Sequence, residues 1–117
     1  KRYNNESYEA GDDVIRKLSA TLSSILRPND FLGRWRMGDE FIVILPSTSI
    51  REAAVVAERL RASVQAASRE WLYPTSVSIG IACHPAHGST ANDLLDAAES
   101  ALKTSKQKGK NCVTVAP

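Results

Sequence analysis

Cysteine, aromatic residues and net charge are all scarce in this chain of 117 residues. The sequence holds two cysteines, its aromatic content is 6%, and its formal net charge is +2. Two cysteines supply neither a disulfide framework nor a metal-binding pattern. We therefore expect Cys83 and Cys112 to be reduced thiols of a cytoplasmic protein. The small net charge gives no support for nucleic acid as a partner.

Long apolar runs are also missing. No stretch approaches the roughly 20 apolar residues that a membrane-spanning helix needs. Hydrophobic residues make up 43% of the chain and charged residues 24%, which is ordinary for one globular domain of this length. Because the sequence starts at Lys1 without a methionine, we expect it to be a domain of a longer parent protein, with a first strand before Lys1. The parent protein could be tethered to a membrane through a region outside this sequence.

Hydrophobic periodicity predicts three amphipathic helices. The first opens at Gly11 and stops before Pro28, because proline cannot continue a helix. The second runs from about Arg51 to about Ala67, after the breaker and cap signal at 46–49. The third runs from near Ala91–Asp93 to a glycine cap at Gly109. The predicted core faces comprise Val14, Leu18, Leu22 and Ile25; Ala53, Val56, Ala57, Leu60 and Val64; and Leu95, Ala98 and Leu102.

Four strands are predicted between and after these helices. Residues 31–35 and the apolar run 42–45 form a hairpin, and the apolar run is expected to be a central strand covered on both faces. Residues 76–82 alternate, with a face of small residues that allows close packing by a helix. A short strand at 112–115 closes the chain. With one strand added before Lys1, this order predicts an extended ferredoxin-like α+β fold, with helices flanking a mostly antiparallel sheet.

Two adjacent carboxylates, Asp39 and Glu40, stand at the tip of the predicted hairpin. Charged side chains at a hairpin tip often do no more than face solvent. The alternative is a divalent-metal site, since paired hard oxygen ligands suit Mg²⁺ held together with substrate phosphates. Spacing alone leaves both interpretations open.

Seven short motifs occur along the chain in one order. They are Lys1-Arg2-Tyr3-Asn4-Asn5, Gly11-Asp12-Asp13-Val14-Ile15, Arg27-Pro28-Asn29-Asp30, Gly38-Asp39-Glu40-Phe41, Ser76-Val77-Ser78-Ile79-Gly80-Ile81-Ala82, Ala98-Glu99-Ser100-Ala101-Leu102 and Lys106-Gln107-Lys108-Gly109-Lys110-Asn111. Together they resemble the motifs of the GGDEF domain, the family of diguanylate cyclases. The resemblance runs through residues 1–117 and lacks only the family's first strand.

The resemblance implies an enzyme that condenses two GTP molecules into cyclic di-GMP and pyrophosphate. Its cofactor would be Mg²⁺, with a pair of ions in each active site. Asp39 and Glu40 would be the catalytic metal ligands, and Asp39 would help to activate the attacking 3′-hydroxyl. Turnover would require a homodimer, and the parent protein would carry an N-terminal sensory or receiver region.

The same resemblance assigns nucleotide-binding residues. Lys1, Lys106 and Lys110 match positions that hold the triphosphate, and Asn4 and Asp12 match the pair that binds guanine. Gly38 would allow the backbone to approach the nucleotide. Each of these residues also has an ordinary alternative: the two C-terminal lysines could form a solvated helix end, and Asp12 could be an acid near a helix N-terminus.

A second nucleotide site is implied on the other side of the family's domain. Arg27 and Asp30 match the R-x-x-D of the site that binds cyclic di-GMP and inhibits the enzyme, and Arg59 matches a supporting arginine. The alternative is that Arg27 and Asp30 only end a helix.

Four departures from the family pattern favour a second functional class. Met37 replaces the first signature glycine, and the segment 34–38 is one residue longer than the family's R-x-G-G. The segment from Asn4 to Asp12 is one residue shorter, and the first metal aspartate of the family would precede Lys1. The alternative function is therefore a degenerate GGDEF module that acts as a cyclic di-GMP receptor or a regulatory interaction domain.

Overall fold

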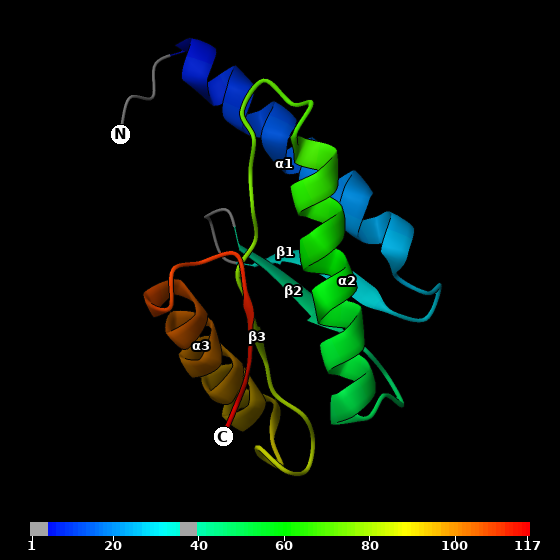
Figure 1. The fold of residues 1–117 in the computed structure, drawn as a ribbon. Helices are drawn as coiled ribbons and strands as arrows, with labels where there is room; N and C mark the ends of the chain where they lie inside the picture. Colours follow the sequence, from blue (N-terminus) through cyan, green and yellow to red (C-terminus); the bar gives the residue numbers. More distant parts are fainter. Residues whose placement is uncertain (1–4, 36–39) are drawn as a thin grey trace.

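The computed structural model describes the backbone of residues 5–35 and 40–117, with side chains from residue 11 onward. The elements follow the predicted order of helix, strand, strand, helix, strand, helix and strand (Figure 1). Their bounds are α1 Asn5–Ile25, β1 Phe31–Trp35, β2 Glu40–Ile44, α2 Ile50–Ser68, β3 Ile79–Ile81, α3 Ala91–Gln107 and β4 Val113–Val115.

The four strands form two pairs. The strands β1 and β2 are antiparallel, and their register runs from Phe31 opposite Ile44 to Trp35 opposite Glu40. The strands β3 and β4 are parallel, with Ile79 opposite Val113. The hairpin therefore places Glu40 at the mouth of β2.

Three predicted details are wrong. The helix α1 begins at Asn5, so the predicted start at Gly11 lies inside the helix. The predicted strand 76–82 is hydrogen-bonded as a strand only over β3, where β4 lies alongside. The apolar run of β2 is not covered throughout, since Ile44 is 51% exposed. An exposed end is physically possible there because Phe31, directly opposite on β1, is equally open to solvent.

The predicted core faces of α1 and α2 meet each other. Leu18 and Leu22 of α1 form one buried cluster with Leu60 and Val64 of α2, and Val64 is completely buried. Figure 1 shows α1 crossing behind α2. Burying side chains of this size stabilises a fold by roughly 1.5–3 kcal/mol each. The periodicity of the sequence therefore located the main core correctly.

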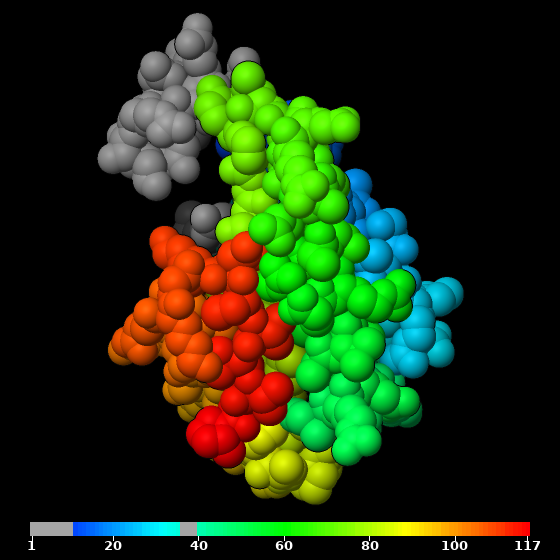
Figure 2. Space-filling view, viewed as in Figure 1, coloured from blue at the N-terminus to red at the C-terminus, as the bar shows by residue number. Residues whose placement is uncertain are grey.

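The helix α3 packs directly on β3. A Cβ atom added at Gly80 would collide with Ala98 O and Leu102 N, and would lie 2.8 Å from Leu102 Cα. This contact confirms that the small-residue face of β3 is where a helix packs closely. The space-filling view shows α3 (orange) and β4 (red) side by side, with β4 next to α2 (green) (Figure 2).

Side-chain caps fix the N-terminal ends of α2 and α3. Ser49 caps α2, and its side chain accepts a hydrogen bond from Glu52 N while the Glu52 side chain accepts one from Ser49 N. Thr90 caps α3 in the same position, and its side chain accepts from Asp93 N. None of the helices in the described part of the chain is long and apolar enough to cross a membrane.

Candidate functional site

A pocket of about 230 Å³ lies between the mouth of β2 and one face of α3. Its lining residues are Glu40, Glu99, Leu102, Lys103 and Lys106. The Lys106 Nζ atom is 3.9 Å from Glu40 Oε2, which is a direct charge contact between the hairpin and α3. The structure thus brings together two of the residues that the sequence assigned to metal and phosphate binding.

The helical repeat explains how α3 contributes to this pocket. Glu99, Lys103 and Lys106 are spaced four and three residues apart, so they lie along one face of the helix. The opposite face is fixed by Ser105, whose buried hydroxyl donates to Ile79 O at 2.9 Å and lies 2.7 Å from Thr114 Oγ1. The rotation of α3 is therefore set by packing, and the charged face turns toward Glu40.

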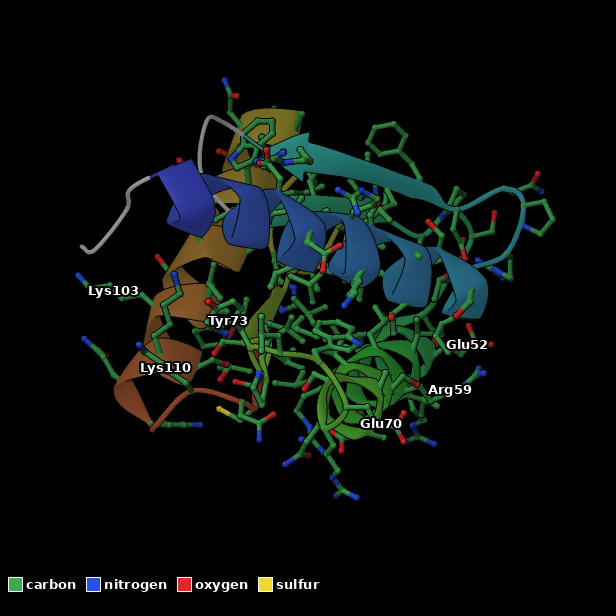
Figure 3. All side chains as sticks on the ribbon, turned by 90° about the horizontal axis from the view of Figure 1, so that it is seen from above. Glu52, Arg59, Glu70, Tyr73, Lys103 and Lys110 are labelled. Carbon is green, nitrogen blue, oxygen red and sulfur yellow. The ribbon has the colours of Figure 1, made fainter. Side chains whose placement is uncertain are left out.

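Lys110 lies on a tight turn beyond α3. Gly109, Lys110 and Asn111 have φ angles of +116°, +68° and +49°, so three consecutive residues are in the left-handed region. The Lys110 amide donates to Ser105 O at 3.0 Å. The Lys110 side chain is exposed and does not line the pocket. Figure 3 shows Lys103 and Lys110 on the α3 side of the molecule, away from Arg59 and Glu52 on α2.

The remaining residues assigned to the GTP site are not among the lining residues of this pocket in the described part of the chain. Lys1, Asn4, Gly38 and Asp39 lie outside the described residues. Asp12 is exposed on α1 and does not line the pocket between β2 and α3. The guanine-binding assignment therefore remains a prediction.

A second cavity, of about 400 Å³, contains all three residues of the predicted inhibitory site. It is lined by Ile25, Arg27, Asp30, Thr48, Arg51, Glu52, Val55, Val56 and Arg59. Arg27 Nη2 is 2.9 Å from Asp30 Oδ1, 2.9 Å from Thr48 Oγ1 and 3.2 Å from Pro46 O, so this guanidinium is held by three neighbours. The Arg27 amide also donates to Asp30 Oδ2 at 2.8 Å. The pair therefore fixes the turn after α1 as well as lining the cavity.

These contacts set the charge state of the pair. Hydrogen bonds from the Arg27 side chain, and then from its backbone amide, lower the pKa of Asp30 below its ordinary value. The hydrogen bond with Asp30 in turn raises the pKa of Arg27. Both groups are therefore ionised at neutral pH. The Asp30 side chain is only 1% exposed, so it is the Arg27 guanidinium, held in place by this carboxylate, that faces the second cavity.

Sequence reasoning missed several lining residues. Glu99 and Lys103 belong to the first pocket, and helical spacing could have indicated them, since Lys103 precedes Lys106 by three residues and Glu99 precedes Lys103 by four. Arg51 and Glu52 belong to the second cavity, beside Arg59 on the same helix. Their positions depend on how α2 lies against the turn after α1, and no local pattern reveals that arrangement.

The first pocket suits a hard cation only in combination with a ligand. No group of three side chains that could hold a metal ion is present among the described residues. Mg²⁺ commonly binds through one or two carboxylates plus substrate phosphates and water. Glu40 offers a carboxylate at the pocket, and Asp39 precedes it in the chain, so the donor chemistry fits Mg²⁺ that arrives with a triphosphate.

Comparison with known proteins gives a consistent result. The family described as "Diguanylate cyclase, GGDEF domain" matches residues 1–112. The chain is 37% identical over 109 residues to the diguanylate cyclase DgcM of Escherichia coli, covering 93% of this chain and 26% of DgcM. It is 35% identical over 112 residues to the response regulator PleD of Caulobacter vibrioides, covering 91% of this chain and 24% of PleD. The chain thus spans about a quarter of the length of these relatives.

Solved structures support the same fold. A crystal structure of the coiled coil and GGDEF domain of DgcB from Caulobacter crescentus, in complex with c-di-GMP, superposes with a TM-score of 0.83 at 28% identity. The match covers 96% of this chain and 61% of that chain. The predicted α+β fold class is therefore confirmed.

Proposed function

The chain belongs to the GGDEF family of diguanylate cyclase domains, and from that premise we propose that its parent protein condenses two GTP molecules into cyclic di-GMP and pyrophosphate. The observation that carries this proposal is the pocket in which Glu40 of the hairpin meets Lys106 of α3. A carboxylate for a cation and an ammonium for phosphate, side by side, are what a triphosphate requires.

In this proposal the lysines of α3 bind the triphosphate. Lys106 exchanges its long contact with Glu40 for a phosphate oxygen, and Lys103 at the same pocket adds a second positive charge. Glu40, free of that contact, and Asp39 would then be the residues that hold the cation. Mg²⁺, when bound, neutralises phosphate charge and favours the deprotonated form of the attacking hydroxyl.

The chemical step joins two nucleotides held by two domains. The 3′-oxygen of one GTP bonds to the α-phosphorus of the other, and the bond from that phosphorus to the leaving pyrophosphate breaks. The proton of the 3′-hydroxyl passes to a carboxylate of the Asp39–Glu40 pair. A second, equivalent step closes the ring, so each domain supplies half of the reaction and a homodimer is required.

The full-length protein provides the direct test. With GTP and Mg²⁺ we expect cyclic di-GMP, and Glu40→Gln is expected to lower the rate of its formation by about 100-fold or more. Glu70→Gln, at an exposed residue beyond the end of α2 (Figure 3), is the matched control and should keep the full rate. Absence of cyclic di-GMP from the full-length protein, even when it is dimerised, would contradict the proposal.

The second cavity favours a further candidate, cyclic di-GMP binding. There Arg59 and the exposed Arg27 guanidinium offer positive charge for a phosphate group and donors for guanine, while the buried Asp30 carboxylate holds Arg27 in place. In an active enzyme this site would inhibit turnover; in a degenerate domain it would make the protein a receptor. Calorimetry should show affinity for cyclic di-GMP that falls about tenfold in Arg59→Ala, and absence of any affinity would end this candidate.

The parent protein is proposed to act in the cytoplasm, under the control of an N-terminal sensory or receiver region. The relative PleD is named a response regulator, and the part of PleD that matches this chain is 24% of its length. A region of this kind would bring two copies of the domain face to face and so set the rate of the reaction.

A further inference from the structure

Arg61 of α2 reaches across to the turn that carries Lys110. Its Nη1 atom donates to Asn111 Oδ1 at 3.0 Å and to Gln65 Oε1 at 3.0 Å. Its remaining nitrogens bind Glu58, with Nε 2.9 Å from Oε1. The side chain is only 17% exposed, so the guanidinium is held in place by partners from two separate segments.

The turn that Arg61 contacts has an unusual backbone. The backbones of Lys110 and Asn111 are both in the left-handed region, which residues other than glycine adopt at a cost in free energy. Such a conformation persists only where the surroundings hold it. Here the Asn111 amide donates to Ser78 Oγ at 3.1 Å, the Lys110 amide donates to Ser105 O, and Arg61 binds the Asn111 side chain.

We propose that Arg61 is a positioning residue for nucleotide binding: through Asn111 it fixes the Gly109–Asn111 turn so that the exposed Lys110 side chain is directed to the triphosphate of bound GTP. This inference rests on the proposed function, since it assumes that Lys110 binds phosphate. Arg61 itself makes no contact with the nucleotide in this account, because its guanidinium is already occupied by Glu58, Gln65 and Asn111.

The expected effect is on substrate affinity. Lys110 binds the triphosphate equally in the ground state and the transition state, so loosening the turn raises KM and leaves kcat nearly unchanged. For Arg61→Met we expect the KM for GTP to rise about 3- to 10-fold, and Lys110→Met should raise it at least as much. Arg61→Lys keeps a donor that can reach Asn111 and should restore part of the affinity.

The experiment uses the full-length protein and a double-mutant cycle. Asn111→Gly removes the acceptor of the Arg61 hydrogen bond, and glycine adopts the left-handed conformation without strain. If the two residues act through one contact, Arg61→Met with Asn111→Gly raises KM no more than either change alone. Arg69→Met, an exposed arginine at the end of the same helix, is the matched control and should leave KM unchanged.

Hydrogen exchange supplies a measurement that does not depend on turnover. Arg61→Met should speed amide exchange at residues 109–112 and leave amide exchange in the β1 and β2 strands unchanged.

Should Arg61→Met fail to fold, Asn111→Gly carries the same test. A wild-type protein that does not bind GTP overturns both this inference and the proposed function. The inference alone is overturned by a different result. In that case the KM for GTP stays at its wild-type value in Arg61→Met and in Asn111→Gly, although it rises in Lys110→Met.

Discussion

At the scale of single residues, each of the two cavities is lined by a pair of oppositely charged side chains. Lys106 of α3 lies 3.9 Å from Glu40 of β2, a long contact that a ligand can displace. Arg27 and Asp30, in contrast, share short hydrogen bonds within one turn. An exchangeable pair suits a substrate pocket, whereas a fixed pair suits a site whose shape is prepared before the ligand arrives.

The Arg27–Asp30 pair predicts how stability depends on pH. Because the folded state lowers the pKa of Asp30 below its ordinary value of 3.8, the pair stabilises the fold fully above that value. The contribution is lost progressively as the pH falls from 3.8 through the folded pKa. We therefore expect wild-type protein to unfold at a higher temperature than Asp30→Asn at pH 7, with the difference shrinking in acid.

Thermal denaturation followed by circular dichroism at a series of pH values measures this difference. Asp96→Asn, at an exposed carboxylate of α3, is the control and should leave the melting temperature nearly unchanged. A gap between wild type and Asp30→Asn that is as wide at pH 2.5 as at pH 7 would show that the ion pair is not its source.

At the scale of elements, the contact between β3 and α3 sets the geometry of the pocket between β2 and α3. Gly80 allows the backbone of α3 to lie directly on the strand, and Ser105 fastens the end of the helix to β3 and β4. The next residue, Lys106, faces Glu40. A shift of α3 away from the sheet would therefore move the predicted phosphate-binding lysine.

Two glycine substitutions distinguish the effect of this close contact on stability from the effect of helix propensity. Gly80→Ala should lower the free energy of unfolding by about 1–3 kcal/mol, because the added methyl group meets helix backbone that cannot give way. Gly11→Ala should raise it by about 0.5–1 kcal/mol, because Gly11 lies within α1 with open space around it. Urea denaturation of both variants checks the pair; equal effects would contradict the packing account.

At the scale of the whole molecule, the domain is elongated, with extents of 44 × 27 × 23 Å. The first pocket lies between β2 and α3, and the second cavity lies where α2 meets the turn after α1. Figure 3 shows the labelled residues of the two regions on different sides of the molecule. In the proposed function, GTP and cyclic di-GMP could therefore bind at the same time, as inhibition from a separate site requires.

The sequence predicts more of this fold than of its cavities. Helical periodicity located the Leu18–Val64 core, because that core depends on local spacing. In α3 the predicted face of Leu95, Ala98 and Leu102 is only partly buried, and the buried residues are Ala101 and Ser105. The start of α1 was placed wrongly, since the Gly-Asp-Asp run is typical of a helix start but lies inside one here. Arg51 and Glu52 were missed for another reason: their role depends on how separate elements pack together.

The central claim is that the pocket between β2 and α3 binds the triphosphate of GTP, and calorimetry of full-length protein with a non-hydrolysable GTP analogue and Mg²⁺ tests it most directly. Removing a charge-assisted phosphate contact in Lys106→Met should weaken binding about tenfold. Lys108 is exposed, directly follows the end of α3 and does not line the pocket, so Lys108→Met should bind the analogue with wild-type affinity. Equal affinity of Lys106→Met and wild type would contradict the claim.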